Sequence, residues 1–205
     1  SHPFLQKSRS DKKAVILITS NRGLAGGYNS NAVKLLTKDE RFTTENTVVY
    51  AVGTKGRDSV EREGYTIAGD YSEAINEPLY ADASEIGKEV LSKFTMGEIG
   101  EIYLIYTIFK NTMVQIPTMM KLLPIDASDI TADAEDVEEN PIDRITLMNY
   151  EPAPEEALNA IIPKYVNSLI FGGLVESHAS ENGARMQAMD SATSNAEEMI
   201  SDLSL

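Results

Sequence analysis

The run Ala14-Val15-Ile16-Leu17-Ile18-Thr19, followed directly by the glycine-rich stretch Ser20 to Gly27 (SNRGLAGG), decides the fold class of this 205-residue chain. A continuous apolar run of this length favours a strand whose two faces are both buried, as in a parallel sheet. The glycine-rich turn leads into a predicted helix over residues 29–38. A strand, a tight turn and a helix in this order predict an α/β fold.

Strands and helices are predicted to alternate as far as residue 151. The further elements are strand 47–52, helix 54–63, strand 65–67, helix 84–94, strand 101–109, strand 113–123 and strand 145–151. Residues 101–109 and 113–123 are expected to pair antiparallel through a tight turn, and Pro117 predicts an edge or a bulge there. The sequence therefore predicts a globular domain over 1–151 with a mostly parallel, Rossmann-like sheet and an antiparallel edge hairpin.

Residues 152–205 predict one long helix instead. About fifty helical residues span about 75 Å, which is too long for the helix to bury its apolar face on its own sheet throughout. Positions spaced alternately by three and four residues form the seam of a left-handed coiled coil; they are Leu158, Ile161, Tyr165, Ser168, Gly172, Val175, Ala179, Asn182, Met186, Met189, Thr193, Ala196, Ile200 and Leu203. The alternative is an amphipathic helix packed on its own domain.

The charge balance excludes several functions. The net charge is -14, which argues against nucleic-acid binding through phosphate neutralisation. Eleven acids and one base lie between residues 126 and 156, and we interpret them as a solvated acidic loop. Calcium-loop spacing fails there, because Thr131 and Val137 stand where glycine and glutamate are required. No apolar run reaches the ~18–20 residues needed to cross a bilayer.

Catalytic and metal-binding patterns are also missing from the sequence. The chain has no cysteine, and its two histidines, His2 and His178, lie far apart. The glycine stretch does not match the G-x-G-x-x-G fingerprint of dinucleotide sites, and Tyr28 stands where a phosphate-binding loop has lysine. We expect a structural turn, with no catalytic, cofactor-binding or metal-binding residues. A nucleotide-dependent enzyme and an oligomeric coiled-coil adaptor with an α/β head stay open as alternatives.

Several strings resemble one known family when they are taken together. They are SNRGLAGGYN at 20–29, FKNTM at 109–113, QIPT at 115–118, YEP at 150–152 and ESHASENGARMQAM at 176–189. The combination is similar to the γ-subunit family of F-type ATP synthases, from about residue 12 to residue 205. Relative to that family, the chain looks like a fragment that lacks the amino-terminal helix and the carboxy-terminal end.

The resemblance implies a rotor without catalytic activity or cofactor. In this family an α/β foot carries an antiparallel coiled-coil shaft inside a ring of α and β subunits, which hold the nucleotide sites. The foot meets the ε subunit and the membrane ring of c subunits. We therefore expect 152–205 to be half of that shaft. The chain is expected to be a peripheral protein on the cytoplasmic face of a bacterial membrane, coupling proton flow to ATP synthesis without entering the membrane.

The resemblance also provides candidate contact residues. Glu181, Arg185, Met186 and Met189 lie in the helix motif and are expected to face the amino-terminal helix or the β subunits. Met186 and Met189 fall on the seam, which favours packing against the helix. The pair Tyr150-Glu151, at the junction of sheet and shaft, is expected to meet ε or the c ring.

Overall fold

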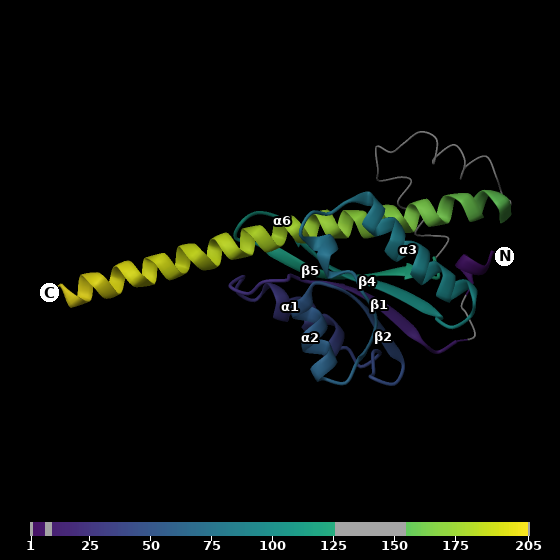
Figure 1. Ribbon diagram of the computed structural model, residues 1–205, viewed down its shortest axis with the longest axis horizontal. Helices are drawn as coiled ribbons and strands as arrows, with labels where there is room; N and C mark the ends of the chain where they lie inside the picture. Colours follow the sequence, from purple (N-terminus) through teal and green to yellow (C-terminus); the bar gives the residue numbers. More distant parts are fainter. Residues whose placement is uncertain (1, 7–9, 126–154, 205) are drawn as a thin grey trace.

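A computed structural model describes residues 2–6, 10–125 and 155–204 (Figure 1). Its elements are, in chain order, η1 (Pro3–Leu5), β1 (Lys13–Ile18), α1 (Tyr28–Thr37), β2 (Thr47–Val52), α2 (Thr54–Arg62), β3 (Thr66–Asp70), η2 (Ser72–Ile75), α3 (Tyr80–Thr95), β4 (Glu101–Phe109), β5 (Gln115–Leu123) and α6 (Glu155–Leu203). The acidic loop and the strand predicted over 145–151 lie outside the described residues. Each element predicted within the described residues is present, with ends that shift by a few residues.

The five strands form one sheet in the order β3-β2-β1-β4-β5. β1 pairs in parallel with β2 and β4, β2 pairs in parallel with β3, and β4 pairs antiparallel with β5. This arrangement confirms the predicted sheet and its antiparallel edge hairpin. The strand order also runs outward in both directions from β1, which defines a doubly wound α/β sheet.

β1 is the central strand of the sheet, and helices cover both of its faces. Residues 14–18 are completely buried, and alternate side chains of a strand point to opposite faces. Ile16 and Ile18 join the core under α3 and α6, whereas Val15 and Leu17 join the core under α1 and α2. Burying a side chain of this size stabilises the fold by about 1.5–3 kcal/mol. The glycine-rich stretch therefore begins at the end of a rigid, buried strand.

α6 is a single 49-residue helix with two different halves. A stripe of apolar residues on the first half is 0–6% exposed against the sheet; it consists of Leu158, Ile162, Val166, Ile170 and Leu174. From Met186 onward nearly every residue is exposed, and this end of the helix projects away from the sheet (Figure 1). Packing on the protein's own domain, the alternative weighed from sequence, thus describes the first half of α6 only.

The seam predicted from the sequence lies mostly on another face of α6. Gly172, Val175 and Asn182 are exposed, because spacings of four residues, and not the heptad, select the side that meets the sheet.

Within Glu156–Leu203 one 18-residue window, with mean hydropathy 1.2, is long and apolar enough to cross a membrane by length and composition. Core helices meet the same criterion, and a third of this window is buried inside the protein.

Candidate functional site at the junction of α6 and the sheet

The crevice between the carboxyl ends of β1 and β4 is where a doubly wound sheet ordinarily binds its ligand, because the strand order reverses there. The last residues that pair between these strands are Leu17 and Ile105. β4 continues to Phe109, while the chain after β1 turns away through the glycine-rich stretch. The backbone of β4 beyond Ile105 therefore has no partner from β1.

Side chains of α6 take the place of that partner. The Thr107 backbone N–H donates to Ser177 Oγ at 3.0 Å, and Ser180 Oγ donates to the Thr107 carbonyl at 3.0 Å. The Phe109 N–H donates to Glu176 Oε2 at 2.8 Å. Ser177 and Ser180 are completely buried. Buried backbone groups that would otherwise be unsatisfied thus fix α6 at one position along β4.

These hydrogen bonds explain how β5 accommodates Pro117. Pro117 lies opposite Thr107 in the antiparallel pair, and the N–H and carbonyl of Thr107 both bond to α6. Opposed residues alternate between pairs with and without hydrogen bonds, so Pro117 occupies a pair that needs no N–H. The prediction of an edge position is confirmed, since β5 is the last strand of the described sheet.

Tyr28 closes the crevice from the glycine-rich stretch. Its side chain is 5% exposed and packs with Ala25 and Ala184, and its hydroxyl donates to the Ser177 carbonyl at 3.1 Å. Burial raises the pKa of Tyr28 far above its ordinary value, and the Glu181 carboxylate raises it further. The phenol therefore stays protonated and remains a donor. The turn itself needs Gly26, whose φ of +59° is left-handed.

Glu181 and Arg185 form an ion pair beside Tyr28. Arg185 Nη1 donates to Glu181 Oε2 at 2.9 Å, and the two side chains are 13% and 10% exposed, respectively. Arg185 Nε also donates to the Gly23 carbonyl at 3.4 Å, which ties α6 to the glycine-rich stretch. Arg185 Nη2 is buried and has no partner among the described residues.

The structure separates the predicted contact residues. Glu181 and Arg185 lie in the junction, whereas Met186 and Met189 are 55% and 59% exposed on the projecting half of α6. The pair Tyr150-Glu151 lies outside the described residues.

Other junction residues were missed from sequence. They include Glu176, Ser177, Ser180 and His178, whose Nδ1 lies 2.9 Å from the Ile75 carbonyl of η2. Ser177 follows Leu174 by three residues and Glu181 follows Ser177 by four, so both stay on the helix face of the buried apolar stripe. That continuation is the signal that identifies buried polar residues in this position.

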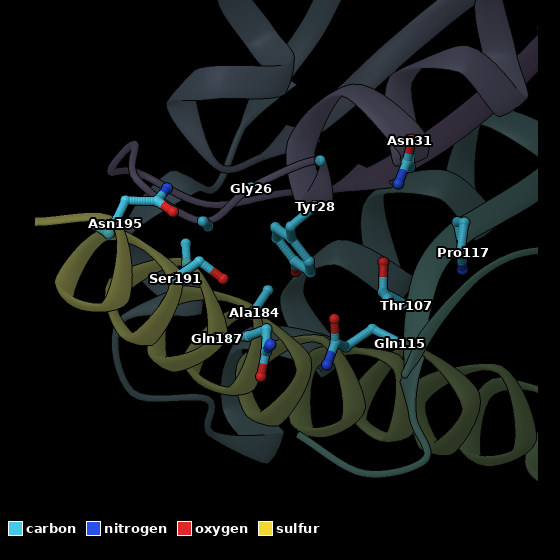
Figure 2. Close-up of a pocket in the computed structure, with 14 residues that line it drawn as sticks. Gly26, Tyr28, Asn31, Thr107, Gln115, Pro117, Ala184, Gln187, Ser191 and Asn195 are labelled. Carbon is cyan, nitrogen blue, oxygen red and sulfur yellow. The ribbon is translucent and has the colours of Figure 1, made fainter. Parts of the chain in front are cut away.

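A cavity of about 550 Å³ opens beside the junction, between the glycine-rich stretch, β5 and α6 (Figure 2). All its lining residues are uncharged; they are Ala25, Gly26, Gly27, Tyr28, Asn31, Thr107, Gln115, Pro117, Ala184, Gln187, Ala188, Ser191, Ala192 and Asn195. In the part of the chain that the structure describes, no group of three or more acidic, His or Cys residues is placed to hold a metal ion.

Comparisons with known proteins agree with this architecture. A family model described as ATP synthase matches residues 1–205. The chain is 62% identical to the ATP synthase gamma chain of Lachnoclostridium phytofermentans over 205 residues, which is all of this chain and 70% of the relative. It is 42% identical to the sodium ion specific ATP synthase gamma chain of Acetobacterium woodii over 98% of this chain and 70% of the relative.

Solved structures share the fold at lower identity. The central stalk and c-ring structure of the Tetrahymena thermophila mitochondrial ATP synthase matches with a TM-score of 0.64 and 24% identity, over 92% of this chain and 79% of the other. A Euglena gracilis structure of OSCP, F1 and c ring matches with a TM-score of 0.66 and 18% identity, over 96% and 66%.

A doubly wound α/β sheet with a long projecting helix is the architecture of a rotor stalk. The chain belongs to the ATP synthase γ-chain family. The resemblance predicted from the sequence is therefore confirmed, and so is the expectation of a non-catalytic rotor subunit, since the catalytic sites of this complex lie in the β subunits. The complex is associated with a membrane.

Proposed function

We propose that this chain carries rotation between a membrane ring of c subunits and a ring of α and β subunits. The sheet with α1–α3 is the foot, and residues 186–204 are the part of the shaft that enters the catalytic ring. In this assembly the foot meets the c ring and the ε subunit, and the chain lies peripherally on the cytoplasmic face of a bacterial membrane.

The observation that carries this proposal is the division of α6. Its first half is fixed to the foot by the buried stripe and by Ser177 and Ser180, while its second half projects with exposed apolar side chains. These are Met186, Met189, Met199, Ile200 and Leu203, at 55–84% exposure. A helix that left this surface bare would lose the burial that ordinarily stabilises helices in proteins.

The exposed seam supports pairing with a second helix. Val175 is 45% exposed, and together with Met186, Met189, Ile200 and Leu203 it follows the three-and-four spacing of a coiled coil. Two paired helices are stiff enough to transmit torque, whereas a flexible linker relaxes. We therefore propose that 155–204 forms half of an antiparallel coiled-coil shaft, with Met186 and Met189 packed against the other half.

Two other pairs are proposed as partner contacts. Glu181 and Arg185 are proposed to contact the amino-terminal helix or the β subunits on the basis of the family motif, with the Glu181 carboxylate holding the guanidinium in place at 2.9 Å. Tyr150 and Glu151 are proposed to contact ε or the c ring, on the basis of the family resemblance alone.

Reconstitution with α and β subunits tests this function. We expect assembly of a complex whose ATP hydrolysis requires the γ chain, and we expect Met186→Glu with Met189→Glu to impair assembly. Gln187→Glu with Ser194→Glu is the matched control, because it adds the same two negative charges at exposed positions of α6 that lie off the seam. ATP hydrolysis that is independent of the γ chain, or a stable homodimer that ignores α and β, would contradict the proposal.

A further inference from the structure

The hydrogen bonds at the junction come from several segments of the foot at one level of α6. β4 contributes the backbone groups of Thr107 and Phe109, η2 contributes the Ile75 carbonyl, and the glycine-rich stretch contributes the Gly23 carbonyl and the Tyr28 hydroxyl. Their partners on α6 all lie between Glu176 and Arg185. The helix is thus held at one short segment from more than one direction.

The partners also lie on opposite flanks of the helix. At 3.6 residues per turn, successive side chains are separated by about 100°, so Glu176 and His178 project about 100° to either side of Ser177. Ser177 faces β4, while Glu176 bonds to the Phe109 N–H at 2.8 Å and His178 bonds to the Ile75 carbonyl at 2.9 Å. Turning α6 about its own axis in one sense stretches the first bond, and turning it in the other sense stretches the second.

The apolar stripe cannot supply this resistance by itself. Hydrophobic burial is non-directional and depends on the area removed from water. A small rotation of α6 that keeps Ile170 and Leu174 covered therefore has a low cost. Hydrogen bonds, in contrast, are directional and weaken steeply when their angle is bent. A fixed backbone partner cannot move to restore that angle.

We propose that Glu176 and His178 are positioning residues that resist rotation of α6 about its own axis, relative to the foot, when torque is applied. This inference rests on the rotor function proposed above and deepens it. Ser177 and Ser180 set the position of α6 along β4, and the two flanking residues fix its angle. Torque would then pass from helix to foot through hydrogen bonds to the backbone of β4 and η2.

A single-molecule rotation assay on the assembled complex tests the proposal. The catalytic sites are held by a non-hydrolysable nucleotide, and a bead on the foot reports the distribution of angles. Glu176→Ala with His178→Ala is expected to increase the angular variance by about 1.5- to 2-fold, since two of the directional bonds are lost. Glu176→Gln with His178→Asn keeps an acceptor and a donor, and it is expected to restore the variance.

Single variants give a readout that mere structural weakening would not produce. Glu176→Ala and His178→Ala are expected to skew the angular distribution in opposite directions. Lys164→Ala, at an exposed position of α6 that lies off the seam, is the control and should leave the distribution unchanged. If neither single variant skews the distribution, or if both skew it the same way, the proposal is overturned. If the wild-type complex shows no rotation of this chain when ATP replaces the non-hydrolysable nucleotide, the rotor function fails instead.

Discussion

The two halves of α6 form one continuous helix and yet depend on different forces. In residues 158–184 every turn places a buried side chain on the sheet, whereas residues 186–204 have no comparable packing among the described residues. Isolated helices of such length are marginal in water, and tertiary burial stabilises most helices in proteins. The comparison teaches that the first half belongs to the foot, whereas the second half depends on the partner helix proposed above.

The largest expected difference comes from the same substitution in each half. Ile170 is completely buried, and Ile200 is 64% exposed. Ile170→Ala is expected to lower the free energy of unfolding by about 2–5 kcal/mol, because it removes buried methyl groups and leaves a cavity. Ile200→Ala is expected to change it by less than about 0.5 kcal/mol. Urea unfolding of both variants measures the contrast, and equal losses would show that the two halves are not distinct.

Serine substitutions distinguish the halves through hydrogen bonding. Ser180→Ala is expected to destabilise the fold by about 1–3 kcal/mol, since the buried Thr107 carbonyl loses its donor. Ser191→Ala, on the exposed half, is expected to stay within about 0.5 kcal/mol of the wild type. Thermal unfolding provides the measurement. A neutral Ser180→Ala would mean that the hydrogen bonds to β4 contribute nothing to the position of α6.

Two adjacent glycines sharpen the boundary between the packed and open faces of α6. A Cβ on Gly172 would meet nothing within 4 Å, whereas one on Gly173 would lie 3.1 Å from Leu104 Cδ2. Gly172→Ala is expected to raise the free energy of unfolding by about 1 kcal/mol through helix propensity. In Gly173→Ala, crowding against β4 is expected to cancel that gain. Calorimetry on the two variants decides the matter, and identical gains would place both residues on an open face.

The smallest expected effect is the pH dependence of stability that Asp70 contributes in the foot. Burial acts to raise the pKa of Asp70, but hydrogen bonds from Ser72 and Arg57 outweigh it, so the pKa is lowered. The carboxylate therefore contributes stability above its unfolded pKa of about 3.9, and that contribution is lost as the pH falls through the lower folded pKa.

Because Asp70 is 38% exposed, solvent screening limits its contribution to a few tenths of a kcal/mol. Stability measured between pH 6 and pH 2 should fall slightly less in Asp70→Asn than in the wild type. A steeper fall in that variant would contradict the stated sign.

Local sequence patterns account for the sheet and not for the junction. The apolar run in β1 and the hairpin with Pro117 gave a clear prediction, because burial on both faces and a missing N–H act within one or two strands. The hydrogen bonds of Ser177 and Ser180 could not be identified in this way, since their partner, Thr107, is about 70 residues away. The helix face that these serines share with Leu174 indicates burial, but it does not show which backbone groups they bond.

α6 shows why one helical pattern can hide another. The heptad seam through Val175 and Met186 and the four-residue stripe through Ile170 and Leu174 occupy neighbouring faces of the same helix, and the prediction of a coiled coil rested on the first alone. Glu181 and Arg185 were predicted as contacts from the family motif. The structure places them against the glycine-rich stretch, where ion pairing and burial are decided by tertiary position.

Amide hydrogen exchange along α6 tests the central claim most directly. In the monomeric chain we predict strong protection over 158–184, a boundary near Arg185, and rapid exchange over 190–204, because only the first segment is packed on the sheet. Assembly with the α and β subunits is predicted to protect the second segment as well. Uniform protection of α6 in the monomer, or a terminal segment that stays unprotected after assembly, would contradict the account.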